Sequence, residues 1–350
     1  MSKVLAHLMR LWGISLGLRI GHPKIQKIHN SDIINVHEEK GGNMTSFRTM
    51  AFVLFLVIST LANAQTKTPY LYILGVAQDA GFPQAGCFEP HCMPGWVNKE
   101  KRLSATSLAV VDHQTQKNYL FEATPNLPEQ LFLLEQEAPN SELAGVFITH
   151  AHMGHYTGLM YFGREAMGAD QIPVYVMPKM GQYLRKNGPW SQLVSLKNIV
   201  LEPLGDELPV SFKNLEITPF LVPHRDEFSE TVGFSIKGPQ KTALFIPDIN
   251  KWSEWEKDIV DQVEASDYAL IDATFYGDGE LPGRDMSKIP HPFVMETMAA
   301  LSQLSEQQRA KVWFIHMNHT NPLLNLNSEQ SKVVRDRGFN IARSGLRLPL

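Results

Sequence analysis

The stretch that decides the fold is Phe147-Ile148-Thr149-His150-Ala151-His152-Met153-Gly154-His155-Tyr156-Thr157-Gly158-Leu159. Its three histidines lie within six residues and follow an apolar run, residues 144–148, that predicts a buried strand. Imidazole is the commonest neutral metal ligand near physiological pH, and a strand end is a rigid support for such ligands. The alternative is a chance cluster on a polar loop, which the strand before it and Gly158-Leu159 after it argue against. We therefore expect a metal site at the end of this strand.

Length and composition are those of a soluble globular protein. A chain of 350 residues holds one large α/β domain or two small ones, and 43% hydrophobic with 19% charged residues is an ordinary balance. The formal net charge of −4 gives no basic footprint, which argues against nucleic acid as a partner. The two cysteines, Cys87 and Cys92, are too few for a disulfide scaffold.

Residues 44–64 have the pattern of a secretory signal peptide. One positive charge precedes the apolar run 51–62, which is short for a membrane span, and Ala62-Asn63-Ala64 resembles a cleavage site. Residues 1–43 are an extension of doubtful status, so we expect translation to start at Met44 or Met50. An uncleaved membrane anchor is the alternative. A cleaved signal leaves one domain, residues 65–350, in a periplasmic or secreted protein.

The order of apolar, strand-like runs and helical patterns predicts two sheets in this domain. Expected strands cover 70–77, 107–112, 118–122, 144–149, 174–177, 199–204, 208–212, 215–222, 231–236, 243–246, 268–272, 312–315 and 341–348. Expected helices cover 127–137, 180–186, 191–196, 252–265, 292–304 and 329–337. This order favours an α/β fold in which two sheets pack face to face with helices outside, a four-layer αββα sandwich.

Further polar residues follow predicted strands directly. His224 comes after residues 221–223, Asp248 after 245–247, and His316 after 313–315. Any one of them alone would be a structural, hydrogen-bonded residue. Together with the histidine stretch they predict a metal centre built from loops at one edge of the sandwich.

These motifs resemble the metallo-β-lactamase superfamily, whose signature is His-x-His-x-Asp-His after a strand, then a later His, an Asp and a final His. Three segments are similar to coenzyme PQQ synthesis protein B and its relatives: Gly81-Phe82-Pro83-Gln84, Glu122-Ala123-Thr124-Pro125-Asn126 and His316-Met317-Asn318-His319-Thr320-Asn321-Pro322. The resemblance covers the chain from about residue 70 to its end, and it implies the αββα fold.

The resemblance also implies the metal ligands. The first metal would be held by His150, His152 and His224. Asp248 would bridge to a second metal, which would also be held by His155 and His316. Zinc, as one or two ions, is the expected metal for such a nitrogen-rich set, and iron and manganese are compatible.

Gly154 stands where the superfamily signature has its aspartate. Glycine has no side chain to bind a metal, so three outcomes are open. The second metal site is weak or empty, another residue substitutes, or catalysis has been lost while the fold remains. The candidate substitutes are Asp79, Asp272 and His319.

The resemblance implies further roles near the metals. Asp248 and His291 are the expected catalytic residues, with His291 as candidate general acid; a purely structural histidine between two prolines is the alternative. Asp272 resembles an aspartate that orients a ligand histidine. Cys87, His91 and Cys92 either supply three ligands of a structural zinc or, as export favours, contain a disulfide.

We therefore expect an exported metal-dependent hydrolase in which a metal-activated water attacks an ester, phosphoester or amide. One alternative is an iron-dependent oxidation related to quinone cofactor biosynthesis, and another is a non-catalytic binding protein that kept the fold. The expected partner is a small-molecule substrate, with no nucleic acid, no membrane after signal cleavage, and at most a second copy of the chain in a homodimer.

Overall fold

The computed structural model describes residues 68–350. The predictions for residues 1–43 and 44–64 lie outside the described residues. Within the described part, no helix combines the length and apolar character needed to cross a membrane.

The first sheet is mixed and has the strand order β14-β1-β2-β3-β4-β5-β6. Strands β3 to β6 are parallel to one another, whereas β1, β2 and β14 pair antiparallel. The strands are β1 (Tyr70–Gly75), β2 (Ser107–Asp112), β3 (Lys117–Phe121), β4 (Glu142–Phe147), β5 (Ile172–Val176), β6 (Ile199–Pro203) and β14 (Arg347–Pro349).

The second sheet repeats this design, with the order β13-β12-β11-β10-β9-β8-β7. Strands β10 to β13 are parallel, and β7 to β10 form an antiparallel meander. The strands are β7 (Val210–Ser211), β8 (Glu216–Leu221), β9 (Val232–Lys237), β10 (Thr242–Ile246), β11 (Tyr268–Asp272), β12 (Val312–Ile315) and β13 (Asn340–Ile341).

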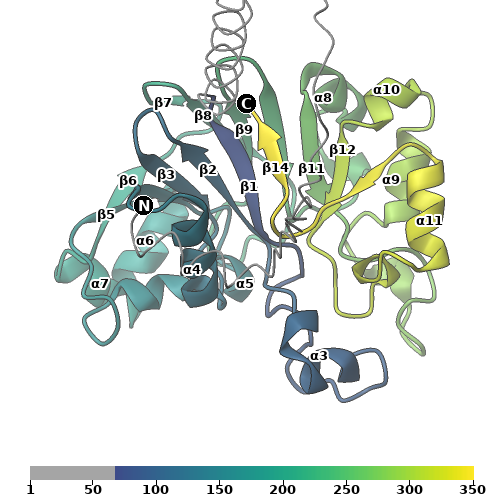
Figure 1. The fold of residues 1–350 in the computed structure, drawn as a ribbon, viewed down its shortest axis with the longest axis horizontal. Helices are drawn as coiled ribbons and strands as arrows, with labels where there is room; N and C mark the ends of the chain where they lie inside the picture. Colours follow the sequence, from purple (N-terminus) through teal and green to yellow (C-terminus); the bar gives the residue numbers. More distant parts are fainter. Residues whose placement is uncertain (1–67) are drawn as a thin grey trace, which may run out of the picture. The chain divides into compact units, whose positions relative to one another are not determined.

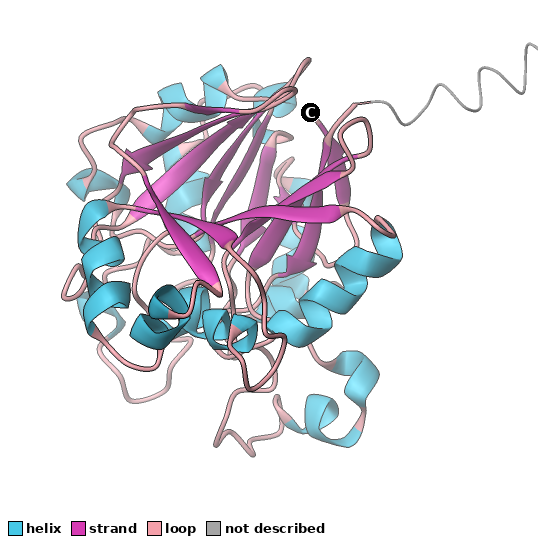
Figure 2. Cartoon of the chain, turned by 90° about the vertical axis from the view of Figure 1, so that its left-hand side faces the viewer, coloured by secondary structure: helices cyan, strands magenta, loops and turns pink. Residues whose placement is uncertain are grey.

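Helices cover the outer face of each sheet, so the predicted four-layer αββα sandwich is confirmed (Figures 1 and 2). Apolar side chains of α4 (Leu127–Glu137), α6 (Pro178–Lys186) and α7 (Trp190–Ser195) pack on the first sheet. Those of α8 (Ile259–Ala265), α9 (Val294–Ala300) and α11 (Glu329–Asp336) pack on the second. Short helices lie at α3 (Met93–Val97), α5 (Met153–Tyr156) and α10 (Glu306–Arg309).

An aromatic cluster holds the two sheets together. The ring of Phe121 stacks on Phe147 of the neighbouring strand, and their centroids are 5.1 Å apart. It also meets Phe234 and Phe245 of the opposite sheet edge-on, at 5.4 and 6.2 Å. All four rings are fully buried. This core fixes the strand ends from which the polar loops of the site emerge.

Two predicted elements were wrong in detail. The last expected strand, 341–348, is split into β13 and β14, which belong to different sheets. Gly345, at a φ of +86°, turns the chain between them. The expected helix 252–265 begins only at Ile259, because Asp258 caps it by accepting from the Val260 N–H.

Candidate metal centre

Three imidazoles that the sequence places in different segments converge on one point. His150 and His152 follow β4, and His224 follows β8. The His152 Nδ1 lies 2.8 Å from His150 Nε2 and 3.3 Å from His224 Nε2. Three nitrogens at such separations match the spacing of ligands around one zinc ion with bonds of about 2 Å.

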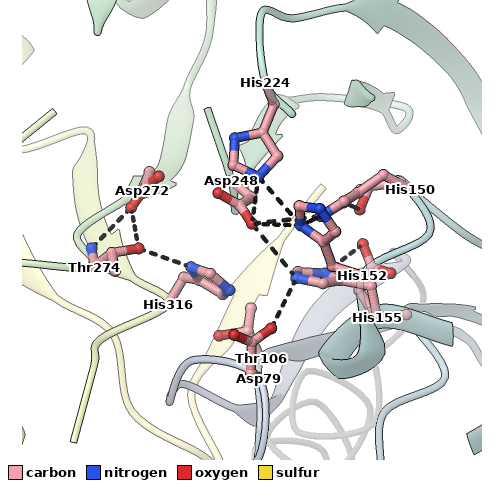
Figure 3. Close-up of polar contacts among 12 residues, drawn as sticks. Asp79, Thr106, His150, His152, His155, His224, Asp248, Asp272, Thr274 and His316 are labelled. Atoms are coloured by element: carbon pink, nitrogen blue, oxygen red, sulfur yellow. Dashed lines mark hydrogen bonds and ion pairs between the residues drawn. The ribbon is translucent and has the colours of Figure 1, made fainter. Parts of the chain in front are cut away.

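The carboxylate of Asp248 lies at the centre of the cluster (Figure 3). Its Oδ2 is 3.2 Å from His224 Nε2, 3.4 Å from His150 Nε2 and 3.7 Å from His155 Nε2. Burial alone would raise the pKa of Asp248, but His224 and His291 hold it well below its usual range. The group is therefore ionised, and it faces both halves of the cluster.

The second half of the cluster combines His155, His316 and Asp79. One ligand atom from each of the three lies within 4.8 Å of the others. His155 Nε2 is 3.9 Å from Asp79 Oδ1. Burial lowers the pKa of His316. Burial also favours neutral His155, but Glu122, Asp248 and Asp79 raise the pKa of His155 to about 9.

A polar side chain lies behind every imidazole of this cluster, within hydrogen-bond distance for all of them except His155. The pairs are His150 with Thr149 (2.9 Å), His152 with Glu227 (3.4 Å), His155 with Glu122 (3.6 Å), His224 with Asn250 (3.2 Å) and His316 with Thr274 (3.0 Å). Such outer partners fix the tautomer and orientation of metal-binding histidines. The second nitrogen of each ring is thereby left for the centre.

The inward-facing atoms fit a cation. His155 Nε2, His316 Nε2 and Asp248 Oδ1 are buried and have no hydrogen-bond partner among residues 68–350. A buried polar atom without a partner destabilises a protein by about 1–3 kcal/mol. Lone pairs of imidazole and carboxylate around one point are the donor set that zinc and related divalent ions prefer. The cluster thus has the composition of a His/Asp metal site.

Asp272 and His291 lie behind and beside this cluster. Asp272 Oδ1 accepts from the Thr274 hydroxyl (2.7 Å), which in turn contacts His316 Nδ1. Asp272 Oδ2 lies 2.8 Å from His291 Nδ1, and Asp248 Oδ1 lies 3.2 Å from the same nitrogen. Burial favours neutral His291, but Asp272 and Asp248 raise the pKa of His291 to about 9. Asp272 therefore orients two histidines at once.

Glu122 was not among the predicted site residues. It follows β3, is fully buried and has a φ of +72°. Neither of its carboxylate oxygens has a hydrogen-bond partner among residues 68–350, and Oε1 lies 3.6 Å from His155 Nδ1. The signal that could have revealed it is its position directly after the strand residue Phe121, since Asp248 and His316 also follow strands closely.

His319 does not join the second half of the metal centre, so this predicted substitute was wrong. Its ring stacks on His91 at a centroid distance of 5.6 Å, and its Nδ1 contacts the Asn318 side chain at 2.9 Å. It thus lies beside Cys87 and Cys92, which form a disulfide in the structure. The chain turns away from the centre after His316, which has a φ of +66°.

We expect the two thiols to be oxidised in the purified protein. Unfolding without reductant should then expose no group that reacts with Ellman's reagent, because the disulfide survives loss of structure. If zinc held Cys87 and Cys92 instead, unfolding in the presence of a chelator would release two free thiols. Parallel metal analysis of the folded protein distinguishes the two states.

A cavity of about 510 Å³ opens beside the metal centre. His224 and Asn250 form part of its wall, but the His224 imidazole itself is fully buried, so the cavity lies behind His224 on the side of Asn250. Its walls carry six carboxylates and two lysines, namely Asp206, Glu207, Asp226, Glu230, Glu254, Glu256, Lys179 and Lys257. The lysines pair with Asp226 (3.7 Å) and Glu207 (2.5 Å). An excess of negative charge therefore lines this cavity next to His224.

A family model described as the beta-lactamase superfamily domain matches residues 117–317, more than half of the chain. This span contains the histidine stretch, His224, Asp248 and His316. The chain belongs to the metallo-β-lactamase superfamily.

Within this superfamily, the chain is similar to coenzyme PQQ synthesis protein B. It is 27% identical to that protein from Acinetobacter baumannii over 314 residues, which cover 80% of this chain and 100% of the relative. The same protein from Xanthomonas campestris is 23% identical over 306 residues, with 80% and 99% covered.

Solved structures share the metallo-β-lactamase fold of this chain. Zn²⁺-bound PqqB from Methylobacterium extorquens matches with a TM-score of 0.67 at 21% identity and covers 80% of this chain and 100% of its own. A diphosphatase of the PhnP family matches with a TM-score of 0.56 at 18% identity, covering 81% and 98%. The predicted fold and superfamily are thus confirmed.

Proposed function

We propose that this protein is a metal-dependent hydrolase that uses a metal-activated water on an ester, phosphoester or amide bond. The observation that carries the proposal is the arrangement of five imidazoles around Asp248, each with a polar side chain behind it. Preorganised ligands of this kind belong to catalytic or structural metal sites. The His152 side chain is 16% exposed, so the cluster reaches solvent, as a catalytic site does and a closed structural site does not.

The chain's own residues would divide the work as follows. His150, His152, His224 and Asp248 would hold the metal. A divalent cation so held lowers the pKa of bound water and polarises the reacting oxygen. His291 has its Nδ1 engaged by Asp272 at 2.8 Å, so its Nε2 is the nitrogen that would give a proton to the leaving group. Asp272 would keep that ring oriented through the reaction.

The acidic cavity bears on the choice of substrate. Like charges repel most strongly where water is partly excluded, so carboxylates beside His224 disfavour a substrate that carries negative charge away from the reacting bond. An uncharged or cationic ester, lactone or amide is favoured over a phosphodiester. The expected partner is accordingly a small molecule.

Zinc-loaded protein should therefore hydrolyse an uncharged ester at least about tenfold more efficiently than an anionic diester. The measurement compares kcat/KM for para-nitrophenyl acetate, a simple lactone and bis-para-nitrophenyl phosphate, with zinc or manganese restored. His152→Ala is the inactive control, because it removes one ligand of the first metal. If neither the esters nor the diester were turned over by the wild type, the hydrolase proposal would be abandoned.

The similarity to coenzyme PQQ synthesis protein B favours a second candidate, an iron-dependent oxidation related to quinone cofactor biosynthesis. Metal analysis of the purified protein separates the two. Zinc supports hydrolysis, a single iron ion supports oxidation, and protein without metal supports a binding protein that kept the fold. Export through residues 44–64 is part of our proposal and argues against cofactor assembly in the cytosol.

A further inference from the structure

Gly154 lies where a side chain cannot be accommodated. It is buried in α5, between His152 and His155. A Cβ atom added there would lie 2.3 Å from the Cα and 2.7 Å from Oδ1 of Asp79. The first of these contacts is with backbone, so a larger residue could fit only if the connection between β1 and β2 moved. The space beside residue 154 is thus filled by Asp79 itself.

Asp79 brings a carboxylate to this same place from another segment. Its Oδ1 lies 3.9 Å from His155 Nε2, and it forms one potential ligand group with His155 and His316. His155 Nε2 and His316 Nε2 are buried and have no hydrogen-bond partner among residues 68–350. Figure 3 shows Asp79 approaching His155 from the side opposite Asp248. Two unpaired imidazole nitrogens therefore face one partly exposed carboxylate.

The other candidate carboxylate is already engaged. Asp272 accepts from the N–H groups of Ile249 (3.1 Å) and Thr274 (2.7 Å), from the Thr274 hydroxyl and from His291. Both of its oxygens serve donors behind the cluster, so it is suited to orient ligands and not to bind the ion near His155.

We propose that Asp79 replaces the aspartate missing at position 154, so that Asp79, His155 and His316, with Asp248 shared between the halves, hold a second divalent cation. The proposal rests on the proposed metal centre and deepens it. Gly154 is then a requirement of the site, because any Cβ there would displace Asp79.

The test is the number of zinc ions bound, measured by equilibrium dialysis and elemental analysis at a fixed free Zn²⁺ concentration. The wild type should hold two ions per chain in the metal centre. Asp79→Asn should hold one, because its dissociation constant for the second ion should rise at least about tenfold. Glu89→Gln, an exposed carboxylate of the same connection, is the matched control and should keep two.

A second variant reaches the same carboxylate by steric means. Gly154→Ala should also hold one ion, because its methyl group pushes Asp79 away. Gly181→Ala is its control, since a Cβ there meets only Val176 at an ordinary 3.5 Å. The double variant, Asp79→Asn with Gly154→Ala, should bind the second ion no more weakly than the single variant with the larger loss of affinity. The reason is that both changes act through one contact.

A wild type with one ion in the metal centre, or an Asp79→Asn protein that keeps two with unchanged affinity, would overturn the proposal. Should Gly154→Ala fail to fold, Asp79→Asn decides alone. The readout does not involve turnover, so the two proposals fail separately. A wild type that binds two ions but hydrolyses nothing would contradict the hydrolase proposal and remain consistent with the proposed role of Asp79. A wild type that binds one ion and hydrolyses the ester would support the hydrolase proposal and contradict the proposed role of Asp79.

Discussion

Asp248→Asn should abolish hydrolysis and weaken metal binding by more than about a hundredfold. Loss of a partner behind a ligand typically weakens metal binding 10- to 100-fold, and Asp248 is a direct neighbour of both halves of the cluster. Its Oδ2 lies within 3.7 Å of three imidazole nitrogens, from His150, His155 and His224. Asparagine keeps the shape of the side chain but removes the negative charge that offsets the cation. Bound zinc and kcat/KM are measured on the same preparation.

Asp112→Asn is a matched control for this variant. Asp112 is as buried as Asp248, with 2% against 4% of its surface exposed, but it is the last residue of β2, at the edge of the sheet opposite to the metal centre. It accepts from the Gln114 N–H (2.9 Å) and the Thr115 hydroxyl (2.8 Å). Its replacement should lower stability by about 1–3 kcal/mol and leave zinc content unchanged. Equal loss of zinc in both variants would show that Asp248 acts through folding alone.

The polar residues that end apolar strands were the part of the site that the sequence could predict. His224, Asp248 and His316 each follow at least three apolar residues, and parallel strands bring their ends to one edge of a sheet. The structure places all three against His150, His152 and His155. The fold was predictable for a related reason, because runs of apolar residues marked the strands, most of which are buried along nearly their whole length.

Contacts between distant segments could not be predicted in this way. Whether Asp79 lies against Gly154 depends on how the connection after β1 packs on α5, and Asp79 adopts a φ of +39° to do so. Glu122 ends its strand as Asp248 does, but a glutamate after a hairpin strand is ordinarily exposed, so residue type gave no sign of its burial. The separation of β13 from β14 likewise depends on which sheet has a free edge.

Glu280 should make the protein less stable as the pH rises through neutrality. Its carboxylate accepts from the Thr320 hydroxyl (2.5 Å) and from the Tyr276 N–H (2.6 Å), and so ties the loop after β11 to the segment after β12. Burial raises the pKa of Glu280 from 4.5 to about 7, although both hydrogen bonds oppose this change. The folded state therefore binds the proton more tightly than the unfolded state.

The sign of the effect follows from that difference in pKa. The stabilisation is fully present below pH 4.5 and is lost as the pH rises to about 7, with a total of about 3 kcal/mol. Glu280→Gln keeps an acceptor but cannot ionise. The unfolding free energy of the variant, minus that of the wild type, should therefore rise by about 2–3 kcal/mol between pH 5 and pH 8.

Denaturant unfolding at both pH values measures this difference, and comparison with the wild type cancels the contribution of the metal centre, which both proteins share. Asp278→Asn, an exposed carboxylate of the same loop, is the control and should follow the wild type at both pH values. The reason is that folding takes the Glu280 carboxylate out of water without supplying a cationic partner, whereas Asp278 is exposed to solvent. If the unfolding free energy of Glu280→Gln minus that of the wild type stayed constant from pH 5 to pH 8, the Glu280 carboxyl group would ionise as readily in the folded chain as in the unfolded one.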